Sequence, residues 1–86
     1  MNICIRGTFK CTWDNMVARF EANMASASDA HTGWAVAKEG ENGVIFIANI
    51  VDFEALGGLM INEDQLNWDK DNGVEYAAYT MQPIGD

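Results

Sequence analysis

The chain has 86 residues, and thirteen acidic against five basic side chains give it a net charge of −8. This charge would repel phosphate backbones and anionic membrane surfaces, so neither nucleic acid nor a membrane is expected as a partner. No apolar run reaches the ~20 residues of a membrane span, and no signal peptide is visible. The length predicts one domain over residues 1–86 with an acidic, well-solvated surface.

The two cysteines, Cys4 and Cys11, are predicted to be unlinked. Seven extended residues span about 23 Å, whereas the Cα atoms of a disulfide lie within about 7 Å. Two free thiols indicate a reducing cytoplasm. We expect no metal and no cofactor, because the single histidine, His31, has no second ligand at a suitable spacing, and no phosphate loop or dinucleotide fingerprint exists.

The first third of the chain predicts a strand followed by a helix. Residues 2–9 place Ile3, Ile5 and Phe9 on one face, which is typical of a strand. Thr12 can then cap a helix that extends to about Ser28. Its apolar residues recur at i, i+3, i+4, i+7 and i+11 and form one stripe. They are Trp13, Met16, Val17, Phe20 and Met24.

A hairpin is the strongest local prediction in the middle of the chain. Residues 34–39 and 44–51 are strand-like, and Asn42-Gly43 between them is a typical hairpin turn. Asp52 can cap a second helix, which contains the helix-weakening pair Gly57 and Gly58. We interpret the pair as allowing close packing on the sheet; the alternative is a break that permits movement.

The last third predicts a further helical turn and a final strand. Asn62 with Gln65 three residues later resembles a capping box, and it precedes Leu66 and Trp68. Asn72-Gly73 ends that turn, and residues 74–81 form a strand. The order β, α, β, β, α, β predicts an α+β, ferredoxin-like fold. Its four-stranded antiparallel sheet has the first and third strands in the centre and helices on one face.

Both faces of this sheet are predicted to be apolar. In the third strand Val44, Phe46, Ala48 and Ile50 lie on one side, and Ile45, Ile47 and Val51 on the other. The helices cover one face only, so the second face, about 400 Å² in area, predicts a homodimer in which two copies pack through their sheets.

Arg6 is the one charged residue expected in a central strand. Its interpretation as an ion pair with Glu75 is favoured, and an anionic ligand is the alternative.

The chain resembles the dimeric α/β-barrel superfamily of ferredoxin-like proteins over nearly its whole length. The resemblance rests on the strand that ends at Phe9, the first helix, His31 and Gly33 before the second strand, the two Asn-Gly turns, and Asp52. It is nearest to the small uncharacterised members and more distant to the antibiotic-biosynthesis monooxygenases. It implies a dimer, and by analogy it raises a small-molecule enzyme as a possible function.

Asn49 is the most informative polar residue, because an amide in an apolar strand must find hydrogen-bond partners. A two- or four-residue hairpin loop makes cross-strand residue numbers sum to an odd number. That register places Trp34, Val36 and Lys38 on the same face as Asn49. Asn49 and Trp34 are therefore the first candidate ligand-binding residues, and Trp13 and Tyr76 supply further aromatic surface.

Three functions remain open. The leading hypothesis is a homodimeric domain that binds a small apolar or aromatic molecule between sheet and helices. The second is a cofactor-independent monooxygenase or isomerase acting on a small aromatic or polyketide-like substrate, with His31 and Tyr76 as candidates to move a proton. The third is a structural or interaction module without a ligand, whose apolar faces serve assembly alone. Independently of these, the alternative for Asn49 is a hydrogen bond to the backbone or to the dimer partner, and that for His31 is a loop residue without a functional role.

Overall fold

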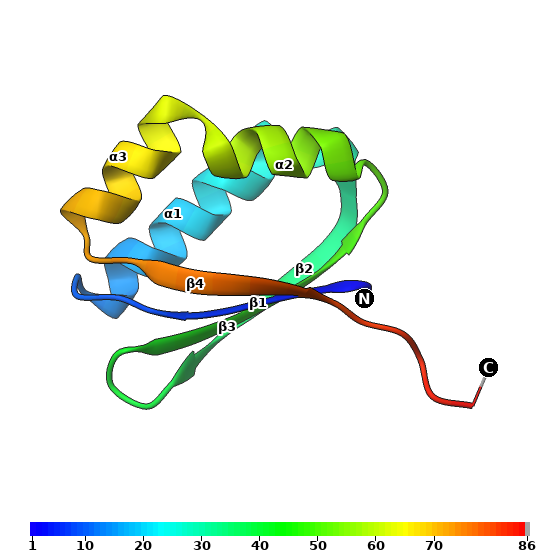
Figure 1. Ribbon diagram of the computed structural model, residues 1–86, viewed down its shortest axis with the longest axis horizontal. Helices are drawn as coiled ribbons and strands as arrows, with labels where there is room; N and C mark the ends of the chain where they lie inside the picture. The colour runs from blue at the N-terminus through cyan, green and yellow to red at the C-terminus, as the bar shows by residue number, and fades with distance from the viewer. Residues whose placement is uncertain (86) are drawn as a thin grey trace.

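The computed structural model describes residues 1–85 as a single sheet covered by helices (Figure 1). Its strands are β1 (Ile3–Thr8), β2 (His31–Glu39), β3 (Gly43–Ile50) and β4 (Glu75–Thr80). Its helices are α1 (Trp13–Ser26), α2 (Phe53–Ile61) and α3 (Glu63–Asp71), with a short 3₁₀ turn at Ser28–Ala30. The predicted order is confirmed, with the second helical region divided in two at Asn62.

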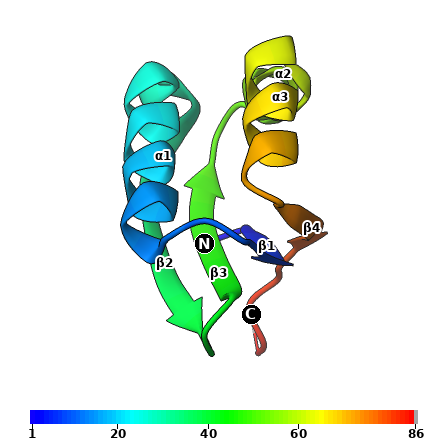
Figure 2. The ribbon, with the colours of Figure 1, turned by 90° about the vertical axis from the view of Figure 1, so that its left-hand side faces the viewer.

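The sheet has the strand order β2-β3-β1-β4, and all neighbouring strands are antiparallel. The first and third strands are central, as predicted. Figure 2 shows α1 on one side and α2 and α3 on the other side of the same face, with no helix on the opposite face. The fold class is therefore the predicted α+β, ferredoxin-like type.

The core lies between the helices and this face, which we call the inner face. The predicted alternation along β1 and β3 is confirmed, because alternate residues of both strands are buried there: Ile3, Ile5, Val44, Phe46, Ala48 and Ile50. From α1, Met16 and Met24 are buried, and the ring of Phe20 stacks on that of Phe46 with centroids 4.9 Å apart. The apolar stripe of α1 thus packs on the sheet as its spacing predicted.

Three polar side chains begin the three helices, each by accepting a hydrogen bond from a backbone N–H three residues later. Thr12 accepts from Asn15, Asp52 from Ala55, and Asn62 from Gln65, at 3.2, 3.0 and 2.8 Å. These caps satisfy donors that the first turn of a helix leaves free. All three were predicted from the sequence.

The hairpin is present, but its predicted loop length is wrong. Glu39 pairs with Gly43, so the loop comprises three residues, 40–42, and Gly40 adopts the left-handed conformation with φ +67°. Cross-strand numbers therefore sum to an even number, and Trp34 pairs with Ala48 rather than sharing a face with Asn49. A change of one residue in the loop exchanges the two faces of the strand.

The interpretation of Gly57 and Gly58 as sites of close packing is also wrong. A Cβ atom added to either glycine would meet no atom within 4 Å. Both glycines lie inside α2 without a positive φ, so neither contact nor conformation requires them.

Arg6 forms its ion pair with Glu39 instead of Glu75, at 2.8 Å between Nη2 and Oε1. Both glutamates lie on the outer face of the sheet, and the guanidinium reaches across β3 to β2. Because both partners of the pair are well exposed, the pair contributes little to stability.

Cys4 and Cys11 are free, as predicted. Among the described residues, no helix combines the length and the hydropathy that crossing a bilayer would require.

The open space around Gly58 leads to a stability prediction. Gly58→Ala should raise the free energy of unfolding by up to about 1 kcal/mol, because alanine costs less backbone entropy in a helix. Gly7→Ala is the contrasting control, since its Cβ would overlap the carbonyl oxygen of Glu75 and lie 2.8 Å from the Cβ of Tyr76. Urea denaturation measures both, and a destabilised Gly58→Ala would contradict the account of α2.

Candidate functional site

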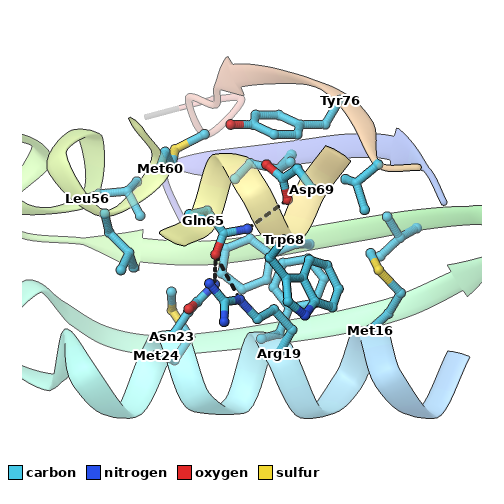
Figure 3. A pocket seen from close by; sticks show the side chains of 16 residues that line it. Met16, Arg19, Asn23, Met24, Leu56, Met60, Gln65, Trp68, Asp69 and Tyr76 are labelled. Carbon is cyan, nitrogen blue, oxygen red and sulfur yellow. Dashed lines mark hydrogen bonds between the residues drawn. The ribbon is translucent and has the colours of Figure 1, made fainter. Parts of the chain in front are cut away.

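A cavity of about 70 Å³ lies between the inner face of the sheet and the three helices (Figure 3). Apolar side chains form most of its wall, and a polar cluster lies on one side. The lining residues are Ile5, Met16, Arg19, Phe20, Asn23, Met24, Val44, Phe46, Leu56, Leu59, Met60, Gln65, Trp68, Asp69, Val74 and Tyr76. Every helix and the strands β1, β3 and β4 contribute to it.

The apolar wall follows from the helical periodicity. Met16, Phe20 and Met24 lie four residues apart on α1 and so point to the same side of that helix. Opposite them, α2 contributes Leu56 and Met60, which are also four residues apart. The sheet closes the floor with side chains of its inner face.

Gln65 holds the polar side of the cavity together. Its Oε1 accepts a hydrogen bond from Nε of Arg19 and another from Nδ2 of Asn23, both at 2.9 Å. Its Nε2 donates to Oδ1 of Asp69 at 2.7 Å. Because two donors from α1 occupy the oxygen, the NH₂ group must point toward Asp69. The amide thus links α1 to α3 across the cavity.

Among residues 1–85, Asp69 is the one charged residue that is buried, with 8% of its surface exposed. Burial raises the pKa of its carboxyl group above the usual value, an effect that the Gln65 hydrogen bond and the charge of Arg19 oppose. Gln65 is its one side-chain hydrogen-bond partner among residues 1–85. The second carboxylate oxygen therefore has no protein donor in the described part of the chain.

Tyr76 lies next to Asp69 at the end of the cavity closed by β4. Figure 3 shows the Asp69 carboxylate between the Gln65 amide and the Tyr76 ring. Burial, and secondarily the negative charge of Asp69, raise the pKa of the Tyr76 hydroxyl. In the sheet Tyr76 pairs with Gly7, where a larger residue would collide with its Cβ. The absence of a side chain at Gly7 therefore leaves room for the side chain of Tyr76 on the neighbouring strand.

Arg19 makes a second contact that orients the cluster. Its guanidinium carbon lies 5.3 Å from the centre of the Trp68 ring, within the range of a cation–π interaction. Arg19 therefore contacts α3 at two points, Gln65 and Trp68, and its charge stays close to the buried carboxylate.

Of the predicted site residues, only Tyr76 lines the cavity. Trp34 lies on the inner face and packs against Phe46, with ring centroids 5.9 Å apart. Trp13 packs against Phe9 at the same centroid separation. Both rings belong to the core and do not line the cavity.

Asn49 and His31 have other surroundings than predicted. Asn49 lies on the outer face and donates to Oγ1 of Thr32 at 2.6 Å, so the predicted pairing with Trp34 is wrong. His31, the first residue of β2, donates from Nε2 to the carbonyl oxygen of Met24 at 3.0 Å near the end of α1. Its Nδ1 is buried and has no hydrogen-bond partner within residues 1–85. Neither residue lines the cavity.

The sequence prediction missed Arg19, Asn23 and Asp69, and it assigned Gln65 a different role. Gln65 was predicted to complete a capping box, but its side chain turns to α1 and Asp69. The available signal was the spacing of Gln65 and Asp69, which places them on the same side of α3 as neighbours four residues apart. Among the described residues no group of three potential metal ligands comes together.

No family model matches the chain, and no curated protein matches it. Several solved structures do match the chain. SnoaB, a cofactor-independent oxygenase from Streptomyces nogalater, has 15% identity and a TM-score of 0.64, covering 99% of this chain and 96% of its own. SO0527 from Shewanella oneidensis has 10% identity and a TM-score of 0.60, covering 93% and 89%. Rv0793 from Mycobacterium tuberculosis has 12% identity and a TM-score of 0.57, covering 100% and 98%.

The chain therefore has the fold of the dimeric α/β-barrel proteins, which was predicted from the sequence resemblance. At sequence identities of 10 to 15%, the likeness to these structures shows the fold alone. The activity has to be argued from the site itself.

The bridging role of Gln65 leads to a second prediction. Gln65→Ala should lower the free energy of unfolding by about 1–3 kcal/mol, because it leaves polar groups of α1 and the buried carboxylate without a partner. Asn67→Ala, on an exposed position of the same helix, is the matched control. Thermal or urea denaturation of both variants makes the comparison. Equal stability of the two variants would contradict the role given to Gln65.

Proposed function

We propose that this protein is a homodimeric domain that binds a small apolar or aromatic molecule in the cavity between sheet and helices. The observation that supports this most is the cavity itself, whose wall is apolar except for one polar cluster. Small-molecule sites commonly combine an apolar wall with a few convergent polar groups that orient the ligand. The Arg19, Asn23, Gln65 and Asp69 cluster supplies those groups.

The size of the cavity indicates how a ligand would enter. At about 70 Å³ it is smaller than the ~150 Å³ apolar cavity that accepts benzene in another protein. An aromatic ligand must therefore widen it, and α2 is the wall best suited to move. Its Leu59 and Met60 line the cavity, and the space where a side chain at Gly57 or Gly58 would begin is open to 4 Å.

The five methionines provide the direct test of ligand binding. Met16, Met24 and Met60 line the cavity, whereas Met1 and Met81 do not. In a protein labelled with ¹³C at the methionine methyl groups, benzene should shift the NMR signals of the first three in a saturable manner. The other two report non-specific binding. Uniform shifts of all five signals, or none, would contradict the proposed cavity site.

Filling the cavity supplies the matched pair of variants for this experiment. Leu59→Phe should abolish the benzene response by occupying the space of the ligand. Leu66→Phe makes the same substitution at a position that does not line the cavity and is 52% exposed, so its response should be unchanged. If Leu59→Phe binds benzene as well as the unaltered protein, the ligand lies elsewhere.

An enzyme is the second candidate, favoured by the presence of Tyr76 beside the buried Asp69 in the cavity. The fold shared with the oxygenase SnoaB is compatible with a cofactor-independent monooxygenase, and an isomerase is the other form of this candidate. Incubation with 1-naphthol in air distinguishes binder from oxygenase. Recovery of unchanged 1-naphthol in mass spectrometry keeps the binder first. A naphthoquinone, which has one more oxygen atom and two fewer hydrogen atoms because the second atom of O₂ leaves as water, makes the oxygenase the leading function.

The homodimer is proposed on the basis of the outer face of the sheet, which no helix covers. Ile45 and Ile47 are partly exposed there, Tyr79 is 56% exposed, and alanines surround them on β2 and β4. The Arg6–Glu39 pair neutralises the charge of Arg6 on this face. A second copy placed sheet to sheet would bury this apolar surface.

Sedimentation equilibrium at micromolar concentration tests the homodimer. The unaltered protein should have twice the mass of one chain, and Ile47→Lys should shift it to the monomer by placing a charge in the interface. Ile61→Lys makes the same change in α2, where Ile61 is 71% exposed, and should leave the dimer intact. A monomeric unaltered protein would contradict the proposal.

A further inference from the structure

We infer that Asp69 selects the ligand of the cavity, so that the site prefers molecules carrying a hydroxyl or N–H hydrogen-bond donor over isosteric molecules without one. This inference rests on the proposed binding function and adds the chemical class of the ligand. It is carried by the hydrogen-bond pattern around one buried carboxylate.

The hydrogen bonds of Gln65 determine which group of its amide faces Asp69. Arg19 and Asn23 both donate to Oε1 of Gln65, which fixes the orientation of that amide. Gln65 can then approach Asp69 only with its NH₂ group, and it uses Oδ1. A carboxylate has about four acceptor positions, so the side chain keeps unused acceptor capacity at its second oxygen.

The unused acceptor position of Asp69 lies at the cavity. Asp69 is among the lining residues of the cavity and is 8% exposed, so its carboxylate is largely withdrawn from bulk water. The second oxygen is not among the fully buried atoms that lack a partner in the described chain, so a ligand donor would replace solvent there with a hydrogen bond to a charged acceptor. A ligand with only an acceptor there would face the carboxylate with a like partial charge. Among ligands of similar size, the site therefore discriminates by the presence of a donor.

Arg19 and Tyr76 are other polar cavity residues that could bond to the second oxygen of Asp69. The guanidinium of Arg19 lies against Gln65 and the Trp68 ring, and no hydrogen bond joins it directly to Asp69 within residues 1–85. Tyr76 lies beside the carboxylate but makes no hydrogen bond to it in the described chain. Neither group occupies the free oxygen, which leaves that position to the ligand.

Three small aromatic probes test the selectivity. Phenol carries a donor, anisole an acceptor only, and toluene neither. Titrations followed by the methyl signals of Met16, Met24 and Met60 should give phenol about tenfold tighter binding than toluene, the advantage expected of a hydrogen bond to a charged acceptor. Anisole should bind no better than toluene. Equal binding of phenol and toluene would overturn the inference and leave the proposed binding function standing.

Asp69→Asn should abolish this selectivity. The NH₂ group of Gln65 would donate to the oxygen of the new amide at position 69. The NH₂ group of that new amide would therefore face the cavity as a donor. The phenol advantage over anisole should then disappear. Asp71→Asn removes an exposed carboxylate from the same helix and should keep the tenfold preference. An unchanged preference in Asp69→Asn would overturn the role of Asp69.

A measurement on the unaltered protein makes the test independent of whether the variant folds. With ¹³C-labelled aspartate, phenol should shift the carboxyl signal of Asp69 and toluene should not. Equal shifts by both probes would overturn the inference. If no probe moves either the Asp69 signal or the cavity methyl signals, the binding function fails and the selectivity fails with it.

Discussion

The amide of Gln65 is the contact on which the geometry of the site depends. It joins Arg19 and Asn23 of α1 to Asp69 of α3, across a cavity that is otherwise walled by apolar side chains. Buried polar groups are stable only when their hydrogen bonds are made, so this amide must keep one orientation. That orientation determines which oxygen of Asp69 is used by the protein and which remains for a ligand.

The two faces of the sheet have different roles. The inner face supplies the floor of the cavity and most of the core, while the outer face carries the apolar surface assigned to a second copy. Gly7 serves the inner face, because its missing side chain lets Tyr76 lie at the edge of the cavity. A small domain with a cavity in its core gains from additional burial on the opposite face.

Local signals in the sequence were sufficient for the fold. The caps at Thr12, Asp52 and Asn62 and the alternation of Ile3, Ile5 and the residues of β3 depend on neighbours in the chain, and all are observed. The prediction that Trp34 and Asn49 share a face was wrong because it depends on the length of the hairpin loop, which has three residues with Gly40 in the left-handed conformation. The spacing of Gln65 and Asp69 was a local signal, but the link to α1 could not be derived, since Gln65 meets partners that lie 42 and 46 residues earlier in the chain. Only the packing of α1 beside α2 and α3 on the sheet brings them together.

The central claim is that Asp69 is a carboxylate withdrawn from water at the polar side of a binding cavity. An NMR titration of its carboxyl ¹³C signal tests this most directly, because the pKa reports the surroundings of that one group. Burial should raise this pKa above the usual value for aspartate. A pKa at or below the usual value would place Asp69 in a solvated or strongly paired environment and would contradict the account.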